Sequence, residues 1–355
     1  MDDLSKVFHM NGGDEPTSYS RNSSLQKRAA DGISRITSSA LTQMLSSSTN
    51  PAVLSMADLG CSSGPNALSH VKRLLEVVDG NAAASEIRVY LNDLPTNDFN
   101  AIFKGLPDFL NEVKNERDRS IYIGAYPGNF YGRLFPDKTL NFVYSFNSLH
   151  WLSRIPQGMY DERGSSVNKR SIYITERSPP VVSQIYYRQF REDFSSFLKS
   201  RSDEVIAGGK MVLLLLARSG AHHYYSSSFL WEILYESLSR LVAAGEVEEE
   251  RLESYDVHFY APSEEEIEEA VKEEGSFELD VLEIFEVEKD PGEFPSYGAA
   301  VAGAVRSMQE SMMSHHFGFR DGTVLDKVFD HFGASVDQRL TDLRTFTAVT
   351  VLTRL

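Results

Sequence analysis

The sequence predicts an α/β protein in which helices cover both faces of a mostly parallel sheet and a mainly helical cap is attached. Apolar runs of strand length alternate with segments of helix length through residues 1–216. The pattern is mostly helical from 217 to 338, and the last residues are β-branched and alternate in polarity. We therefore predict a sheet domain at 1–216, a cap at 217–338 and a strand within 339–355 that returns to the sheet.

The expected elements follow one another in a regular order. Residues 1–26 are polar and rich in turn formers, and a helical pattern extends from 24 to 45. Within the cap, Pro262, Ser263 and Glu266 match a capping box at the start of an acidic helix. The expected strands are 53–57, 87–91, 121–125, 140–144, 210–216 and 346–355.

The charge balance limits the partners of the protein. The chain has 355 residues, of which 35 are basic and 51 acidic, and a formal charge of −16. This charge argues against nucleic acid or an anionic membrane as the main partner. The longest apolar run, 211–217, is too short to cross a bilayer. The one cysteine, Cys61, excludes an intrachain disulfide, and the N-terminal residues lack the apolar core of a signal peptide, so we expect a cytoplasmic protein.

The turn after the first expected strand is the most informative segment. It begins with Asp58, carries Gly60 and Gly64, and leads into an amphipathic helix. A glycine-bearing turn between a strand and a helix lets the backbone approach a nucleotide-like ligand closely. Its D-x-G-x-x-x-G spacing differs from the dinucleotide-binding and Walker patterns. Asp58 at the start of the turn would repel a pyrophosphate, but it suits a positively charged sulfonium. These features favour S-adenosylmethionine (SAM) as the ligand; a turn that binds no ligand is the alternative.

Polar or aromatic residues follow each of the first four expected strands. Asp58 follows the first, Asp93 the second, Asn129 and Phe130 the third, and the segment 145–151 the fourth. In parallel sheets, ligands bind at the carboxyl ends of the strands. The Asp93 carboxylate is suited to accept hydrogen bonds from both ribose hydroxyls, while Asn129 and Phe130 are suited to hydrogen-bond to adenine and to stack on it. Together these residues predict an adenosine-binding crevice.

These motifs, in this order, resemble those of the SABATH methyltransferases, which use SAM to methylate salicylic, benzoic, jasmonic and related acids and xanthine alkaloids. The resemblance runs nearly from end to end. It rests on M-N-G-G at 10–13, S-Y at 18–19, N-S-S-L-Q at 22–26, A-D-L-G-C-S-S-G-P-N at 57–66, N-D-L-P-T-N-D-F-N at 92–100, P-G-N-F-Y-G-R-L-F-P at 127–136, S-L-H-W-L-S at 148–153 and G-G-K-M-V at 208–212.

The resemblance implies a Rossmann-like SAM-dependent methyltransferase sheet with an α-helical cap over the acceptor site, an N-terminal lid segment and a homodimer. It also implies which residues hold the cofactor. They are Tyr19, Ser23, Asp58, Gly60, Asn66, Asp93 and Leu94, with Asn129 and Phe130 at the adenine and Ser145 and Phe146 in the same cleft.

The same resemblance implies that Gln26 and Trp151 hold the carboxylate of the acceptor. Further residues would shape the acceptor pocket: Tyr19, Asn147, His150, Leu230, Trp231, Met308 and Phe346. Asn147 stands where many members carry an aromatic residue, which makes the pocket roomier and more polar and disfavours a simple salicylate-like substrate. Asn129 replaces a serine that is frequent in the family, and its amide can still hydrogen-bond.

Some members of the family also bind Mg²⁺ away from the reaction centre. The matching positions here are Asn168, Glu253, Tyr255 and Asp256, where an asparagine, an acid, an aromatic residue and an asparagine are usual. Carboxylate oxygens suit Mg²⁺, and a surface cluster without metal is the alternative.

Methylation of a carboxylate requires no general base. A carboxylic acid has a pKa of about 4, so it is already a nucleophile at neutral pH. Gln26 and Trp151 offer neutral N–H donors, which orient the anion without withdrawing its charge. His150 would then be a pocket wall or a hydrogen-bond donor. If the acceptor is a ring nitrogen that bears a proton, His150 becomes a candidate proton acceptor.

The main interpretation is a SAM-dependent carboxyl O-methyltransferase that makes the methyl ester of a small-molecule acid of the salicylate, benzoate, jasmonate, indole-acetate, cinnamate or terpenoid-acid type. N-methylation of a xanthine-type alkaloid is the alternative. The spacing of the turn disfavours a dinucleotide-dependent oxidoreductase. A SAM-binding regulator without catalysis is disfavoured because it would not need Gln26 and Trp151.

Overall fold

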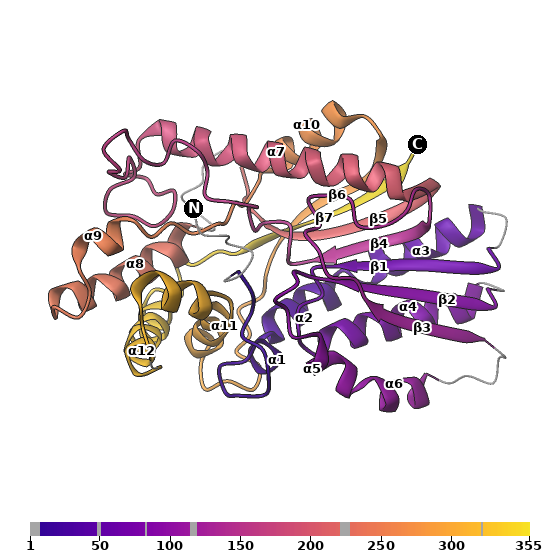
Figure 1. The fold of residues 1–355 in the computed structure, drawn as a ribbon, viewed down its shortest axis with the longest axis horizontal. Helices are drawn as coiled ribbons and strands as arrows, with labels where there is room; N and C mark the ends of the chain where they lie inside the picture. The colour runs from indigo at the N-terminus through magenta and orange to yellow at the C-terminus, as the bar shows by residue number, and fades with distance from the viewer. Residues whose placement is uncertain (1–7, 48–50, 82–83, 114–118, 221–227, 321) are drawn as a thin grey trace.

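A seven-stranded sheet runs through the molecule, as the computed structural model shows (Figure 1). The structure describes residues 8–47, 51–81, 84–113, 119–220, 228–320 and 322–355. The strands are β1 (Val53–Leu59), β2 (Glu86–Asn92), β3 (Ser120–Ala125), β4 (Leu140–Phe146), β5 (Val205–Ala217), β6 (Phe277–Glu286) and β7 (Phe346–Arg354). Their order in the sheet is β3-β2-β1-β4-β5-β7-β6.

Helices cover the sheet and form a group at one of its ends (Figure 1). They are α1 (Tyr19–Asn22), α2 (Ser24–Gly32), α3 (Ser34–Ser47), α4 (Asn66–Asn81), α5 (Phe99–Lys104), α6 (Leu106–Glu112), α7 (Pro180–Glu204), α8 (Ser228–Ala243), α9 (Glu249–Glu253), α10 (Glu264–Glu274), α11 (Tyr297–Phe317) and α12 (Thr323–Gln338). In the part of the chain that the structure describes, no helix combines the length and the apolar character needed to span a bilayer.

Five strands of the sheet are parallel. β3, β2, β1, β4 and β5 are parallel neighbours, and β7 runs antiparallel between β5 and β6. The mostly parallel sheet and the return of the C-terminal strand are therefore confirmed. Because parallel strands point the same way, the residues that follow β1, β2, β3 and β4 meet at one edge of the sheet.

The alternation of side chains along β5 divides the core into two layers. Met211, Leu213 and Leu215 belong to the layer that includes the aromatic residues of α7. Val212 and Leu214 belong to the layer on the other face, with residues of α3 and α4. All five side chains are fully buried. A parallel strand covered on both faces has a continuous apolar sequence, which is why the run at 210–216 predicts it.

The segment 217–338, expected to be mainly helical, also contains β6. This edge strand pairs with β7 and alternates between apolar residues such as Phe277 and Leu279 and acidic residues such as Glu278 and Asp280. Acidic side chains on an edge strand discourage pairing with another molecule. In the sequence, however, these acids continue the acidic run of α10, so the pattern does not predict a strand here.

Two helical predictions are resolved in detail. The capping box of α10 is confirmed, because Ser263 Oγ accepts from the N–H of Glu266 at 3.3 Å and Glu266 Oε2 accepts from the N–H of Ser263 at 3.1 Å. The helical pattern at 24–45 is divided into α2 and α3, which meet at Ile33.

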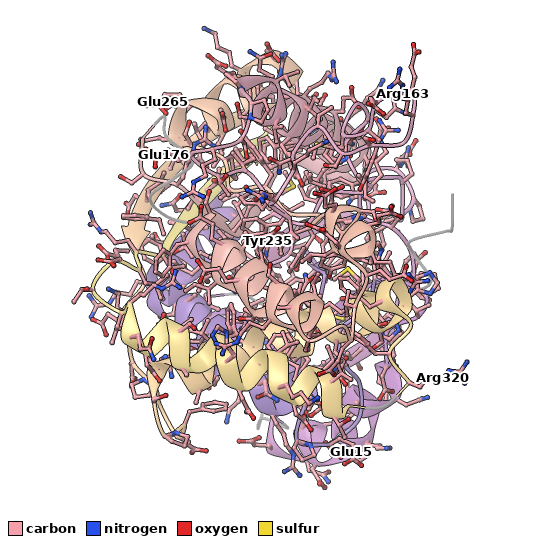
Figure 2. All side chains as sticks on the ribbon, turned by 90° about the vertical axis from the view of Figure 1, so that its left-hand side faces the viewer. Glu15, Arg163, Glu176, Tyr235, Glu265 and Arg320 are labelled. Atoms are coloured by element: carbon pink, nitrogen blue, oxygen red, sulfur yellow. The ribbon has the colours of Figure 1, made fainter. Side chains whose placement is uncertain are left out.

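The helical group lies at the end of the sheet where the parallel strands finish. α11 packs against α12 and also against α1 and α2, and α12 packs against α8. Figure 2 views this group from outside, with Tyr235 of α8 near the centre and Glu265, Arg163 and Arg320 at the rim. The helical group and the N-terminal helices together enclose space at the carboxyl ends of the strands.

A buried ion pair holds the loop that follows β3. Arg201 and Glu204, at the end of α7, have fully buried side chains that meet at 2.7 Å. Arg201 donates to the carbonyl oxygens of Phe130 and Gly132, each at 2.8 Å. Glu204 Oε1 accepts from the N–H of the next loop residues, including Phe135 at 2.9 Å. The position of this loop therefore depends on α7.

Arg201→Met should lower the free energy of unfolding by about 3–5 kcal/mol, because Glu204 would lose its buried cation and keep only the exposed Arg133, whose Nε lies 3.4 Å from Glu204 Oε1. Urea denaturation measures this loss. Lys327→Met is the control, since it breaks the exposed Lys327–Glu246 pair and should cost less than about 1 kcal/mol. Equal losses in the two variants would contradict a structural role for the buried pair.

Candidate active site

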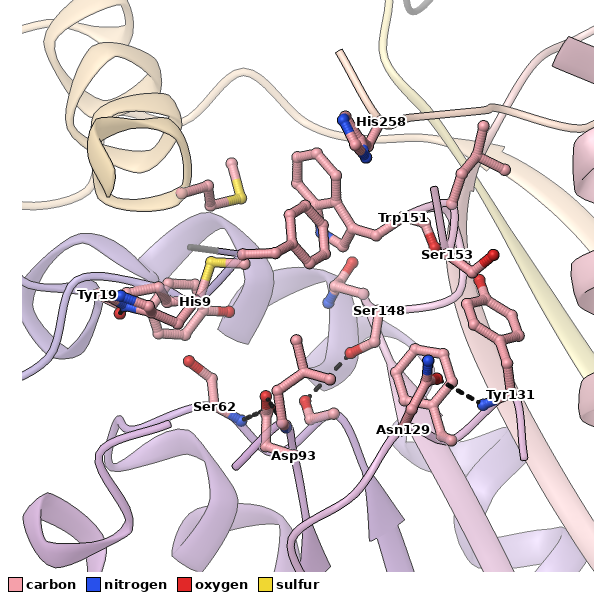
Figure 3. Close-up of a pocket in the computed structure, with 18 residues that line it drawn as sticks. His9, Tyr19, Ser62, Asp93, Asn129, Tyr131, Ser148, Trp151, Ser153 and His258 are labelled. Carbon is pink, nitrogen blue, oxygen red and sulfur yellow. Dashed lines mark hydrogen bonds between the residues drawn. The ribbon is translucent and has the colours of Figure 1, made fainter. Parts of the chain in front are cut away.

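A cleft of about 850 Å³ opens at the carboxyl ends of the parallel strands (Figure 3). It is lined by residues from four separate strand ends. Gly60 follows β1, Asp93 follows β2, Asn129 follows β3, and Ser148 follows β4. The structure therefore brings together the residues from which the sequence predicts an adenosine-binding crevice.

Gly60 places the turn after β1 against the loop after β4. Its φ is +86°, and a Cβ at this position would lie 2.2 Å from Ser148 Oγ. Ser148 Oγ in turn donates to the carbonyl oxygen of Gly60 at 3.1 Å (Figure 3). Both the backbone conformation and the close contact require glycine.

Asp93 is held in place by two backbone amides. Its Oδ2 accepts from the N–H of Ser62 at 2.8 Å, and its Oδ1 accepts from the N–H of Leu94 at 2.8 Å (Figure 3). Burial raises the pKa of Asp93, and the two amide hydrogen bonds oppose this rise. Each oxygen can accept a further hydrogen bond. The fixed carboxylate is therefore suited to bind a pair of neighbouring hydroxyl groups.

Asp58 lies in a recess of about 320 Å³ that shares Gly60 with the cleft. The residue is 2% exposed, and its Oδ2 has no hydrogen-bond partner. Burial and the negative charge of Asp93 raise the pKa of Asp58 well above its usual value, and the neighbouring Tyr144 hydroxyl opposes this rise only in part. A cation in the recess would counter both effects. The recess is therefore suited to a sulfonium or an ammonium group.

Other predicted cofactor residues line or support the recess. Three of them line it: Tyr19, Asn66 and Phe146. Ser23 and Ser145 line neither the cleft nor the recess. Instead, Ser23 Oγ accepts from Asn66 Nδ2 at 3.0 Å, and Ser145 Oγ donates to the carbonyl oxygen of Leu59 at 2.7 Å. These two serines hold the walls of the site in place.

The remaining predicted cofactor residues line the cleft itself. They are Leu94, Asn129 and Phe130. Asn129 Oδ1 accepts from the N–H of Tyr131 at 2.9 Å (Figure 3), which leaves its Nδ2 hydrogens as donors for a ligand. The ring of Phe130 packs edge-on against Tyr131, and Arg201 holds its carbonyl oxygen. This part of the cleft is therefore suited to a flat heteroaromatic ring.

A second cavity of about 790 Å³, mainly apolar, adjoins the cleft. Asn147, Trp151 and Met308 line both spaces, so they form the junction between them. The cavity is also lined by four more of the predicted acceptor residues: Gln26, His150, Leu230 and Trp231. Among the described residues that line this cavity there is no Lys, Arg, Asp or Glu.

Gln26 and Trp151 have polar groups that are not committed to the protein. Gln26 Oε1 is buried without a partner, and Gln26 Nε2 donates to the sulfur of Met308 at 3.7 Å, a weak acceptor. Trp151 is 6% exposed, with its ring packed edge-on against Phe8. No described residue accepts from its indole N–H. Both side chains can therefore donate to a ligand at the junction.

His150 is buried and neutral. Burial lowers the pKa of His150 to about 3. Its Nδ1 accepts a hydrogen bond from the N–H of Leu216 at 3.1 Å, so the ring proton lies on Nε2. In this state the Nε2–H of His150 can donate a hydrogen bond, and the ring has no free nitrogen lone pair to serve as a base.

Phe346 does not line the acceptor cavity, in contrast to the prediction. It begins β7, and the Arg344 guanidinium lies 5.0 Å above the centre of its ring. Its neighbours Thr345 and Thr347 line the cavity instead. Successive side chains of a strand point to opposite faces. The residues on either side of Phe346 therefore face the cavity, and Phe346 itself faces away from it.

Comparison with known proteins identifies the family. The profile of a family described as SAM-dependent carboxyl methyltransferase matches residues 5–355. This chain belongs to that family. It is 38% identical to probable jasmonic acid carboxyl methyltransferase 1 of Theobroma cacao, over 99% of each chain. It is also 38% identical to 3,7-dimethylxanthine N-methyltransferase 1 of Coffea arabica, over 89% of each chain. A solved structure of loganic acid methyltransferase with S-adenosylhomocysteine has a TM-score of 0.85 and 28% identity, over 97% of this chain and 98% of that one.

SAM is the cofactor of this carboxyl methyltransferase, and the residues present fit it. The unpartnered oxygen of Asp58 suits its cationic end, and the fixed carboxylate of Asp93 suits a ribose. The close contact at Gly60 leaves the turn free of side-chain bulk where the ligand approaches.

The positions aligned with the family's Mg²⁺ site fit a metal poorly. They are Asn168, Glu253, Tyr255 and Asp256. The amide oxygen and nitrogen of Asn168 are both hydrogen-bonded within the protein, the Tyr255 hydroxyl donates to Gln309, and one oxygen of Asp256 accepts from Tyr160. The other oxygen of Asp256 is buried without a partner. Mg²⁺ requires near-octahedral oxygen ligands, and the described residues contain no cluster of three or more His, Cys, Asp or Glu that could hold a metal.

Several residues of the cleft are absent from the sequence-based prediction, among them Phe8 and His258. Phe8 and His258 line it and stack on each other with ring centres 5.9 Å apart. Burial lowers the pKa of His258 to about 4. The place of His258 depends on a short bridge between Trp151 and Phe259, far apart in the sequence. A pairing of this kind has no local signal in the sequence.

Asp93→Ala should weaken the binding of S-adenosylhomocysteine by roughly 10- to 100-fold, because charged hydrogen bonds to the ribose would be lost. Isothermal titration calorimetry measures this change, and the affinity for the acceptor should change little. Asp93→Asn keeps one acceptor oxygen and should bind more tightly than the alanine variant. Unchanged affinity in Asp93→Ala would remove Asp93 from the cofactor site.

His150 should make the folded protein less stable in acid. The pKa of His150 is about 3 in the folded protein and about 6.5 in the unfolded chain. Its contribution to the free energy of unfolding is therefore fully present above pH 6.5 and is lost as the pH falls from 6.5 towards 3. Compared with His150→Gln, the parent should lose about 1.4 kcal/mol of unfolding free energy for each pH unit below 6.5. Urea denaturation at pH 7.5 and pH 5 measures this difference. Parallel losses in the two proteins would show that His150 is not buried as the neutral form.

Proposed function

We propose that the protein transfers a methyl group from SAM to the carboxylate of a small-molecule acid with an apolar body, forming a methyl ester. The observation that carries this proposal is the junction between the two cavities. Neutral donors lie there on Gln26, whose Nε2 has only the weak acceptor Met308 Sδ as a partner, and on Trp151, and the adjoining acceptor cavity has no Lys or Arg among its described lining residues.

The chemistry requires position rather than proton transfer. SAM supplies, when bound, a methyl group on a sulfonium that is an excellent leaving group. A carboxylate is already ionised at neutral pH. The protein therefore needs only to orient one oxygen in line with the methyl and to exclude water.

Neutral donors suit this task better than cations. A lysine or arginine would hold the acid strongly but would also lower the nucleophilicity of the reacting oxygen. The Gln26 amide can exchange the sulfur of Met308 for a carboxylate oxygen, which is a much better acceptor. The indole N–H of Trp151 and the Nε2–H of His150 supply further neutral donors.

The state of His150 disfavours the alternative, N-methylation of a xanthine-type alkaloid. A ring nitrogen that bears a proton needs a base, and the candidates that line the cavity are His150 and Tyr297. Nδ1 of His150 already accepts from Leu216. Burial raises the pKa of Tyr297, which therefore keeps its proton. Neither group is suited to remove a proton from the acceptor.

The proposal assigns separate roles to the two cavities. Asp93 would hold the ribose, Asn129 and Phe130 the adenine, and Asp58 the cationic end of SAM. The acceptor would occupy the second cavity. A homodimer and a cytoplasmic location stay predictions from the sequence.

Methyl transfer from labelled SAM to a panel of carboxylic acids and xanthines tests the proposal. A label on an acid that mild base releases is a methyl ester and supports carboxyl methylation. A label on a xanthine that survives base would overturn the proposal in favour of N-methylation.

Trp151→Phe should lower kcat/KM for the acid by about 10-fold, because it keeps an aromatic ring and removes one hydrogen-bond donor to a charged acceptor. The affinity for S-adenosylhomocysteine should stay the same. Trp231→Phe is the matched control, since Trp231 lines the acceptor cavity but not the cofactor cleft. Equal turnover of Trp151→Phe and the parent would show that the indole N–H does not hold the carboxylate.

A further inference from the structure

The acceptor cavity is elongated along α11. Met308, which also lines the cofactor cleft, marks its reaction end. Val305, Val301 and Tyr297 line it in turn along the same helix. Since an α-helix rises 1.5 Å per residue, the wall from Met308 to Tyr297 is about 16 Å long. A single-ring acid with its carboxylate at the junction would leave most of this length empty.

Besides Gln26 Oε1 near the junction, one further side-chain polar atom of the described cavity wall is buried without a partner. Thr347, on β7, lines the cavity and is 1% exposed. Its Oγ1 is buried and forms no hydrogen bond within the protein. A buried hydroxyl without a partner is destabilising, and a ligand oxygen would satisfy it.

Thr347 lies well away from the junction. In the sheet, Thr347 pairs with Leu216 of β5. On the other side of β5, the N–H of Asn147, the residue that follows β4, donates to the carbonyl oxygen of Leu214. The junction and Thr347 are therefore two strands apart, and neighbouring strands are 4.7–4.9 Å apart, which gives a separation of about 10 Å.

We propose that the natural acceptor is an elongated acid that carries a hydroxyl or carbonyl oxygen about 10 Å from its carboxylate, and that Thr347 Oγ1 hydrogen-bonds to this oxygen. The inference rests on the proposed carboxyl methylation and names the class of acid. Thr347 is a specificity-determining residue, and the carboxylate clamp at Gln26 and Trp151 is independent of it.

Matched acids and a matched variant test this inference. Nonanoic acid and 9-hydroxynonanoic acid differ by one distal oxygen, and benzoic acid represents a short acceptor. The variant is Thr347→Val, which removes the hydroxyl and keeps the shape. Thr350→Val is the control, because Thr350 Oγ1 is equally buried and unpartnered on β7 but does not line the cavity.

The measured quantity is the ratio of kcat/KM for 9-hydroxynonanoic acid to that for nonanoic acid. Thr347→Val should lower this ratio by about 3- to 10-fold, the value of one neutral hydrogen bond. Thr350→Val and the hydroxyl-keeping Thr347→Ser should leave it unchanged. Both valine variants should melt at or above the temperature of the parent, because each removes an unpaired buried hydroxyl.

The outcomes separate this inference from the proposed function. Methylation of acids with the same ratio in Thr347→Val and the parent would overturn the role of Thr347. A kcat/KM for benzoic acid equal to that for the longer acids would overturn the elongated acceptor. Methylation of xanthines and of no acid would instead overturn carboxyl methylation, and the inference with it.

Discussion

The contact between Gly60 and Ser148 is the constraint on which the active site depends. It leaves no room for a side chain between the turn after β1 and the loop after β4. The loop leaves β4 through Asn147, whose φ of +60° is unusual for a residue other than glycine. It then reaches Trp151, at the junction of the cofactor cleft and the acceptor cavity. The two substrates can meet only because these segments are pressed together, since methyl transfer requires the reacting atoms to be aligned.

Charge is divided between the two halves of the site. The cofactor half contains the buried Asp58 and the partly buried Asp93, each with a raised pKa because it is desolvated. A cationic cofactor stabilises their ionised forms, so its binding and the ionisation of these acids reinforce each other. The acceptor half has neutral groups, including His150, whose pKa is lowered to about 3 by burial. An anionic acceptor is therefore held without a fixed charge that would weaken it as a nucleophile.

Local patterns predict the parts of this protein that local interactions build. The apolar run at 210–216 and the capping box at Ser263 predict β5 and the start of α10, because burial on both faces and helix capping leave direct marks in the sequence. Asp58, at the end of β1, lines the recess, and Asp93, after β2, lines the adjoining cleft. By contrast, β6 is hidden because its solvent-facing acids continue the acidic run of α10. The exchange of Phe346 for Thr345 and Thr347 depends on the register of β7, and the place of His258 depends on a bridge formed only after folding.

Because the junction can bind any carboxylate, the specificity for the acceptor is determined by the walls of the cavity. Gln26 and Trp151 can bind the carboxylate of any acid, so they cannot distinguish one acid from another. An apolar contact discriminates by only about 1–3 kcal/mol, whereas a buried hydroxyl penalises every ligand that leaves it unpaired. The walls include residues of α2, α8, α11 and β7, and none of these elements carries Asp58 or Asp93. Acceptor preference can therefore change while SAM binding is kept.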